Sequence, residues 1–245
     1  MFNYMNFKEK HVLILGGSSD IGIEVIKIFL ELNWKISAHF NKNSKNLNKL
    51  KKKSNNLNLI KFDFTKDNKK IESLIKKKFK GKYDAIINLV GYIDNIGFEN
   101  TNLKSIIKSL TANMILPILI EKNCVKKMLS QKWGRILNCS SIGIKFGGGF
   151  NSFNYSLSKH SLEFMPNNYK HWAKKNVFIN NLRIGVTDTK IHKRMKKNLQ
   201  MKERIKLIPI KRMAKPKEIA FYIINLVTEN NSYMTGQTLT VSGGE

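Results

Sequence analysis

Short, continuous apolar runs alternate with segments of helical periodicity along the chain. A run such as 11–15 is typical of a strand in a parallel sheet that is buried on both faces. After it, Ile21, Val25, Ile28 and Leu32 recur at helical spacing and predict an amphipathic helix over 20–32. The same contrast predicts further strands at 34–40, 57–62, 83–90, 135–140, 177–184 and 237–241, and further helices at 44–53, 67–79, 102–130, 152–174, 188–206 and 216–228.

The regular alternation of strands and helices predicts an α/β fold. We expect a single-domain Rossmann fold, with a doubly wound parallel sheet of about seven strands flanked by helices. The chain has 245 residues, of which 42% are hydrophobic, and this suits one domain over 1–245 better than two small domains. Ligands of such sheets bind at the carboxyl ends of the strands, so the site is expected there.

The formal net charge of +27 first suggests a nucleic-acid-binding protein. However, the basic residues comprise 39 lysines and only 5 arginines, and they are spread along the whole chain. Proteins that read bases and phosphates rely on arginine forks, and the sequence shows no nucleic-acid-binding motif. We therefore expect no specific nucleic-acid binding, although weak attraction to acidic proteins or polyanions is expected from the charge alone.

Nothing in the sequence predicts a membrane protein or a metal site. No uninterrupted apolar run approaches the roughly 18 residues that cross a membrane. The first eight residues lack the basic region and long apolar stretch of a signal peptide, so a cytoplasmic protein is expected. The two cysteines, Cys124 and Cys139, lack the spacing of a metal-binding motif.

The most informative polar residues are Tyr155 and Lys159, with Ser141 upstream of them. A tyrosine and a lysine four positions apart on a helix lie on one face. A nearby ammonium stabilises a phenolate, so the pKa of Tyr155 is predicted to fall below its ordinary value of about 10. Such a tyrosine can exchange a proton near neutral pH, and a serine hydroxyl beside it can hold a carbonyl or alcohol oxygen. These residues predict the acid/base part of a carbonyl reductase site, which also needs a hydride carrier.

The other part, a hydride carrier, is predicted by the turn Gly16-Gly17-Ser18-Ser19-Asp20-Ile21-Gly22 after the first strand. Glycines between a strand and a helix let a pyrophosphate approach backbone N–H groups at the helix N-terminus. Asp63 ends the third strand, where its carboxylate can bond an adenine amino group, and Asn88 and Gly91 end the fourth. The sequence therefore predicts a dinucleotide site.

The end of the second strand bears on which dinucleotide is bound. It runs His39-Phe40-Asn41-Lys42 and contains no carboxylate for the ribose hydroxyls of NAD. A basic residue at this point suits the 2′-phosphate of NADP. Lys42 therefore favours NADP(H) over NAD(H).

Together these residues resemble the short-chain dehydrogenase/reductase family, and the resemblance covers the whole chain. The motifs follow in the family's order: the glycine turn, Asp63, Asn88-x-x-Gly91, Asn113, Ser141, Tyr155-x-x-x-Lys159, and the segments 208–220, 233–237 and 241–244. Within the family, the chain looks most like the 3-oxoacyl-[acyl-carrier-protein] reductases. That branch uses basic residues to dock an acidic carrier, and Lys132 and Lys175 fall where two of them would lie.

The resemblance implies a role for each candidate residue. Tyr155 would be the acid/base, Ser141 would orient the substrate oxygen, and Lys159 would lower the pKa of Tyr155 and hold the nicotinamide ribose. Asn113 would hold a water in a proton relay reaching Lys159, unless it is only a surface or capping residue. The implied cofactor-binding residues are Gly16, Ser18, Ser19, Ile21, Gly22, Lys42, Asp63, Asn88, Gly91, Tyr155, Lys159, Gly185 and Thr189. The resemblance also implies a substrate lid at about 186–206 and a homodimer or homotetramer.

Four positions depart from the family pattern. Asp20 stands in place of a glycine and brings a charge beside the expected pyrophosphate. Leu89 replaces an asparagine, and Ile184 replaces the proline before the turn that follows the sixth strand. Pro166 falls inside the predicted helix 152–174, where a proline removes a backbone hydrogen bond and kinks the helix at a cost of about 3 kcal/mol.

Two hypotheses of different classes follow. The first is an NAD(P)-dependent oxidoreductase that interconverts a ketone and a secondary alcohol by hydride transfer, with Tyr155 as acid/base. Its substrate would be a 3-oxoacyl group on a carrier, a sugar, a polyketide-like intermediate or a small ketone. The second is a non-catalytic dinucleotide-binding regulatory or scaffold protein, which Asp20 and Leu89 would motivate. The intact set of Ser141, Tyr155 and Lys159 argues against the second hypothesis.

Overall fold

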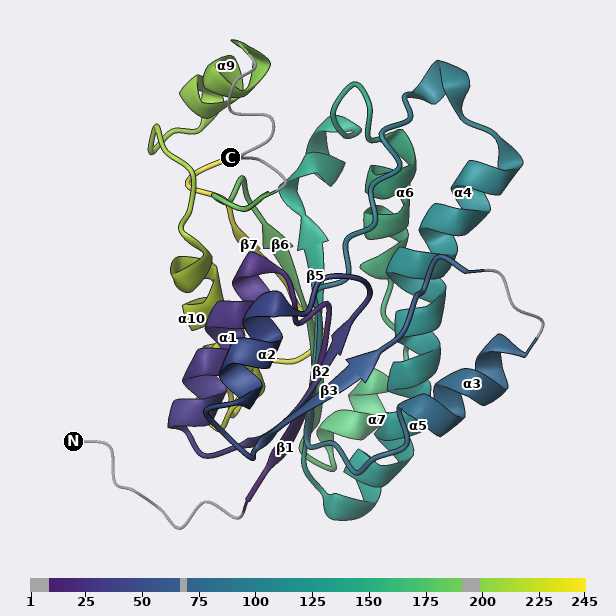
Figure 1. Cartoon of the computed structure of the whole chain (residues 1–245), viewed down its shortest axis with the longest axis vertical. Helices are drawn as coiled ribbons and strands as arrows, with labels where there is room; N and C mark the ends of the chain where they lie inside the picture. Colours follow the sequence, from purple (N-terminus) through teal and green to yellow (C-terminus); the bar gives the residue numbers. More distant parts are fainter. Residues whose placement is uncertain (1–8, 67–69, 191–198) are drawn as a thin grey trace.

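The computed structural model describes residues 9–66, 70–190 and 199–245 and has an α/β architecture (Figure 1). Its seven strands form one parallel sheet in the order β3-β2-β1-β4-β5-β6-β7. The strands are β1 (His11–Leu15), β2 (Lys35–Phe40), β3 (Leu57–Lys61), β4 (Ala85–Asn88), β5 (Gly134–Ser141), β6 (Val177–Ile184) and β7 (Thr238–Val241). The predicted fold class and number of strands are confirmed.

The strand order reverses between β1 and β4. From β1 the chain continues outward to β2 and β3, and it then returns to the centre for β4 and proceeds to the other edge. Leu15 pairs with Asn88, so the carboxyl ends of β1 and β4 are level. The connections that leave these two strands run in opposite directions, which opens a crevice where ligands of such sheets bind.

Helices cover both faces of the sheet (Figure 1). One face carries α1 (Asp20–Glu31), α2 (Lys45–Lys51) and α10 (Pro216–Val227). The other carries α3 (Ile71–Lys78), α4 (Leu103–Leu110), α5 (Leu116–Gln131), α6 (Phe153–Leu162) and α7 (Tyr169–Ala173). Successive side chains of a strand point to opposite faces. Accordingly, Val12 and Ile14 pack in the core beneath α1, whereas Leu13 and Leu15 pack in the core beneath α5.

The long predicted helix 102–130 forms over 103–131 but contains a π-helical turn, Thr111–Ile115, between α4 and α5. By length and mean hydropathy alone, this stretch is long and apolar enough to cross a membrane. The sequence criterion missed it because it counted only uninterrupted apolar runs. Ala112, Leu116 and Ile120 of this stretch are buried against the sheet, as in the core helix of a globular domain.

The predicted helix 152–174 is wrong. The structure has two helices instead, since α6 ends at Leu162 and α7 begins at Tyr169. Pro166 lies in the connection between them. A proline has no N–H to donate and disfavours helical geometry in the residue before it, so the chain leaves the helix before Pro166 rather than kinking through it.

Two further predicted helices are described only in part. Helix α3 begins at Ile71, and residues 67–69 of the predicted helix 67–79 lie outside the described ranges. Of the predicted helix 188–206, the structure describes α9 (Leu199–Leu207), and residues 191–198 lie outside the described ranges. The expected lid at about 186–206 therefore remains a prediction.

Candidate functional site

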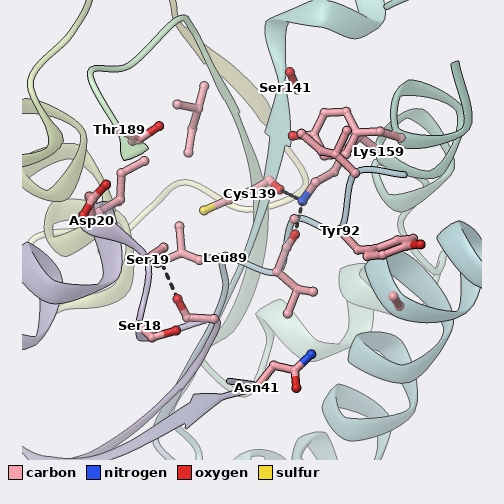
Figure 2. A pocket seen from close by; sticks show the side chains of 18 of the residues that line it. Ser18, Ser19, Asp20, Asn41, Leu89, Tyr92, Cys139, Ser141, Lys159 and Thr189 are labelled. Carbon is pink, nitrogen blue, oxygen red and sulfur yellow. Dashed lines mark hydrogen bonds between the residues drawn. The ribbon is translucent and has the colours of Figure 1, made fainter. Parts of the chain in front are cut away.

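A cavity of about 470 Å³ opens at the carboxyl ends of the strands, at the crevice between β1 and β4 (Figure 2). It is lined by the glycine turn, by residues that end or follow β2 to β6, and by residues of α6. The predicted site residues that line it are Gly16, Ser18, Ser19, Ile21, Gly91, Ser141, Tyr155, Lys159, Gly185 and Thr189. The predicted residues that do not line it are Gly22, Lys42, Asp63, Asn88 and Asn113.

The glycine turn is compact because two of its glycines have no room for a side chain. Gly16 has a φ of 77°, and an added Cβ would lie 2.8 Å from the carbonyl carbon of Leu89. A Cβ on Gly22 would lie 2.8 Å from the carbonyl oxygen of Gly17. Ser19 caps α1: its Oγ accepts from the Gly22 N–H at 3.0 Å and donates to the Gly16 carbonyl at 2.8 Å. The positive N-terminus of α1 therefore borders the cavity and suits a phosphate.

Asp20, the unexpected carboxylate in this turn, has a cationic partner. Its Oδ2 accepts from the backbone N–H of Lys190 at 2.7 Å, and its Oδ1 lies 3.3 Å from the Lys190 ammonium. Both residues line the cavity, and Figure 2 shows Asp20 next to Thr189. The pair ties the segment after β6 to the glycine turn. It also offsets the charge that Asp20 brings beside the expected pyrophosphate.

Ser141 and Lys159 lie on the side of the cavity away from Asp20 (Figure 2), and Tyr155 lines the same cavity. Ser141 ends β5, whereas Tyr155 and Lys159 lie one turn apart on α6. The side chains of Tyr155 and Ser141 are hydrogen-bonded to each other. The Lys159 ammonium donates to the carbonyls of Val90 at 2.7 Å and Cys139 at 2.6 Å. Lys159 therefore fixes α6 to the ends of β4 and β5.

The expected fall in the pKa of Tyr155 is wrong. Burial raises the pKa of Tyr155 above its ordinary value, and the hydrogen bond with Ser141 offsets this only in part. Lys159 gives little help because its ammonium is held by two carbonyls, 5.9 Å from the centroid of the tyrosine ring. Burial also lowers the pKa of Lys159 to about 8, so its ammonium remains mostly protonated at pH 7 but loses its charge above about pH 8.

Asn113 lies in the π-helical turn between α4 and α5 and is fully buried. Its Oδ1 accepts from the Tyr92 N–H at 2.7 Å, and its Nδ2 donates to the Tyr92 carbonyl and the Ser158 hydroxyl, both at 2.9 Å. Asn113 thus joins the loop after β4 to α6, one residue before Lys159. π-helical turns are frequent at functional sites, and this one brings Asn113 within reach of both elements.

Lys42 and Asp63 line a second cavity, of about 580 Å³, together with Lys61 and Lys66. The two cavities share Asn41, whose Nδ2 donates to Oδ1 of Asp63 at 3.0 Å. Burial acts to raise the pKa of Asp63, but hydrogen bonds from the Thr65 hydroxyl and N–H outweigh it and hold that pKa below its ordinary value. Lys42 and Asp63 follow the ends of β2 and β3 and lie beside the main cavity rather than in its wall.

Asn88 acts through the backbone of the strand end. Its Oδ1 accepts from the Val90 N–H at 3.1 Å, and its Nδ2 donates to Oδ1 of Asn138 at 3.1 Å. Asn88 is fully buried, so it shapes the loop after β4 without facing the cavity.

The sequence reasoning missed several residues that line the cavity: His39, Phe64, Tyr92, Cys139 and Thr187. Each ends or closely follows a strand. The signal was available, since the residues at the carboxyl ends of a doubly wound sheet surround its ligand whatever their chemistry. Matching motifs alone does not find them.

The arrangement can carry out one kind of chemistry well. One side of the cavity has a helix N-terminus for phosphates, and the other has a tyrosine and a serine that can exchange a proton with a carbonyl or alcohol. In the described ranges, no group of three or more His, Cys, Asp or Glu side chains gathers as a metal site would.

Comparison with known proteins agrees with this geometry. A family model described as enoyl-(acyl carrier protein) reductase matches residues 17–245. The 3-oxoacyl-[acyl-carrier-protein] reductase of Aquifex aeolicus is 30% identical over 180 residues, which are 71% of this chain and 72% of that protein. The reductase of the same name from Buchnera aphidicola subsp. Schizaphis graminum is 29% identical over 251 residues, 98% of each chain.

Solved structures share the fold. The crystal structure of a 3-oxoacyl (acyl-carrier-protein) reductase from Agrobacterium tumefaciens with NADP bound has a TM-score of 0.84 at 19% identity, and the match covers 96% of this chain and 94% of that one. The structural similarity shows the fold alone, whereas the family model and the Aquifex relative show the family. The chain belongs to the short-chain dehydrogenase/reductase family of oxidoreductases, which act on keto and alcohol groups with a nicotinamide cofactor, and it is similar to 3-oxoacyl-[acyl-carrier-protein] reductases.

Proposed function

We propose that this chain reduces a 3-oxoacyl thioester to the 3-hydroxyacyl product with NADPH. The observation that carries the proposal is the meeting of Ser141, Tyr155 and Lys159 in one cavity with the glycine turn at the N-terminus of α1. The 3-oxoacyl reductases among its relatives support the substrate class. A regulatory or scaffold protein would have no need for these three residues in one cavity.

The residues present fit a dinucleotide, because the glycine turn has no room for a side chain at Gly16 and the N-terminus of α1 borders the cavity. Ser18, Ser19 and Ile21 would hold the pyrophosphate end, and Thr189 and Gly185 the nicotinamide end. The bound cofactor would supply the hydride.

The protein's own residues would handle the proton. The Ser141 hydroxyl would donate a hydrogen bond to the substrate carbonyl oxygen, and the Tyr155 hydroxyl would give its proton to that oxygen as it becomes an alkoxide. The raised pKa of Tyr155 suits a proton donor, since the phenol stays protonated near neutral pH. Lys159 would hold the nicotinamide ribose, and Asn113 would position α6 through the Ser158 hydroxyl.

We propose a preference for NADP(H) over NAD(H). Three lysines, Lys42, Lys61 and Lys66, line the cavity that adjoins the main one at Asn41. The end of β2 presents no carboxylate to repel a 2′-phosphate. Asp63 brings a negative charge to the same cavity, but its carboxylate accepts hydrogen bonds from Thr65 and Asn41.

We further propose a cytoplasmic homodimer or homotetramer. Leu103, Ile107 and Ile118 of α4 and α5 are exposed, and so are Phe221 and Tyr222 of α10. Exposed apolar side chains on neighbouring turns mark surfaces for association. Lys132 and Lys175 are exposed as well, and the net charge of +27 favours an acidic carrier as the bearer of the substrate.

The test is oxidation of NADPH by acetoacetyl carrier protein, run with wild type, Tyr155→Phe and the matched control Tyr83→Phe. Tyr83 is also buried, but it hydrogen-bonds Ser37, away from the cavity lining. We expect Tyr155→Phe to lower kcat by about a thousandfold, as loss of an acid/base does, while NADPH binding and the control's kcat stay unchanged. Turnover that survives in Tyr155→Phe would contradict the role. If the chain reduces a crotonyl thioester and not the acetoacetyl thioester, the proposal is refuted. The activity would then be that of an enoyl reductase, as in the description of the family model.

A further inference from the structure

His39 holds the glycine turn through two separate hydrogen bonds. It lies near the end of β2, is 4% exposed and lines the main cavity. Its Nδ1 accepts from the Gly16 N–H at 3.1 Å, and its backbone carbonyl accepts from the Gly17 N–H at 2.8 Å. One residue thus binds both of the glycines that open the turn.

The other ring nitrogen reaches the third strand. Nε2 of His39 lies 2.9 Å from the carbonyl oxygen of Phe62, the residue before Asp63. A backbone N–H can only donate, so Nδ1 must offer its lone pair to Gly16, and Nε2 must carry the proton that Phe62 accepts. Burial lowers the pKa of His39 to about 4, against the opposing effects of the Phe62 carbonyl and the Asp63 carboxylate. The ring is neutral near pH 7, and both hydrogen bonds are satisfied.

Aromatic packing fixes the plane of this ring. The imidazole stacks on Phe64 with centroids 4.3 Å apart and 13° between the planes, and the ring centroid of Phe79 lies 5.9 Å away in an edge-on contact. Phe64 is buried and also lines the main cavity. The imidazole cannot turn out of this stack without breaking the hydrogen bonds to Gly16 and Phe62 together.

We propose that His39 is a positioning residue for the dinucleotide: it fixes the glycine turn after β1 against the end of β3 before the cofactor binds. The pyrophosphate end and the adenosine end of the proposed site belong to these two segments. A rigid link between them removes part of the ordering that binding would otherwise require. The inference rests on the proposed function in taking a dinucleotide as the ligand, and it adds a residue that acts through Gly16 and Phe62 rather than by touching the reacting atoms.

The test is the affinity for NADPH, measured by its fluorescence, in His39→Phe. This variant keeps an aromatic ring for the stack on Phe64 and removes both side-chain hydrogen bonds. We expect the Kd for NADPH to rise about tenfold, whereas kcat at saturating NADPH stays within about twofold of wild type.

His11→Phe is the matched control. His11 begins β1 at the opposite end of the strands, its Nε2 lies 3.0 Å from the Ser37 hydroxyl, and its ring packs against Tyr83 with centroids 4.7 Å apart. This control should lose stability without a change in the Kd for NADPH. An equal rise in Kd in both variants, or no rise in His39→Phe, overturns the inference.

A second measurement does not depend on the variant's folding. Two-bond ¹H–¹⁵N correlations of the wild type at about pH 7 report which ring nitrogen carries the proton. A neutral His39 ring protonated at Nε2 is expected, and an imidazolium or a ring protonated at Nδ1 overturns the inference. Wild type that binds neither NADPH nor NADH would instead refute the proposed function. The two failures can be told apart, because the protonation of the His39 ring can be measured without any cofactor.

Discussion

The sharpest stability prediction concerns Glu121, a carboxyl group buried in α5. Glu121 is 6% exposed, and its Oε1 has no hydrogen-bond partner among the described residues. Its Oε2 accepts one long hydrogen bond, from Nδ2 of Asn138 at 3.4 Å. Burial raises the pKa of Glu121 to about 8, and the Asn138 contact opposes this rise only weakly. The folded protein therefore holds this carboxyl group neutral near pH 7.

The sign and size of the effect follow from linkage. The unfolded chain releases this proton above its ordinary pKa of 4.5, whereas the folded chain keeps it up to about pH 8. Between these values the folded state binds more protons, so the free energy of unfolding falls as the pH rises. At 1.36 kcal/mol for each unit of pKa, the loss between about pH 5 and about pH 8 is on the order of 3 kcal/mol.

Glu121→Gln removes the ionisation and keeps an oxygen for Asn138. Urea denaturation of wild type and variant should give similar free energies of unfolding at about pH 5, and the variant should be more stable by about 3 kcal/mol at about pH 8. Comparing the two proteins cancels the titration of the groups that do not interact with Glu121. Glu31→Gln, at an exposed residue of α1, is the control and should run parallel to wild type. Parallel profiles for Glu121→Gln and wild type would refute the buried neutral carboxyl.

Two further variants test the contacts of the site and the core. Lys190→Met takes the ammonium away from Asp20, so NADPH should bind several-fold more weakly in a fluorescence titration. Adding Asp20→Asn should restore the affinity, and no recovery in the double variant would show that the two charges are not coupled. Arg135→Met leaves the carbonyls of Gly134, Asn176 and Asn231 without the buried guanidinium, so the free energy of unfolding in urea should fall by about 3 kcal/mol. Arg212→Met, at an exposed pair with Glu218, should have a much smaller effect, and equal losses in the two variants would contradict this account of burial.

The strands could be predicted because each is a continuous apolar run that ends where polar or glycine residues begin. The run 11–15 matches β1 at both ends. The predicted strand 83–90 is longer than β4 because Tyr83 and Val90 are apolar yet lie outside the ladder. The helix over 152–174 failed for a different reason: its apolar spacing persists past Pro166, and only the geometry of the proline ends it.

The chemistry of the site was predictable where it depends on spacing along one element. Tyr155 and Lys159 share a face of α6 because residues four apart on a helix must do so. That Lys42 lines the second cavity and not the main one was not predictable, since the spacing of residues does not fix where a loop side chain lies after a strand ends. The pKa of Tyr155 depends on how deeply the phenol is buried and on what else Lys159 binds, and both come from tertiary packing.

The departures from the family pattern around the cavity are met by contacts elsewhere in the chain. The charge of Asp20 faces Lys190. At Leu89 it is the backbone carbonyl, not the side chain, that packs against Gly16, so this contact does not depend on the side chain. The turn after Ile184 lacks a proline, but the Gly185 N–H donates to the carbonyl of Val241 in β7 at 2.8 Å, so the last strand holds the turn. These contacts hold the walls of the cavity in place at all three departures, and the tyrosine, serine and lysine of the site are unchanged. The pattern therefore favours an enzyme with an altered cofactor-binding site over a scaffold protein that has lost its catalytic residues.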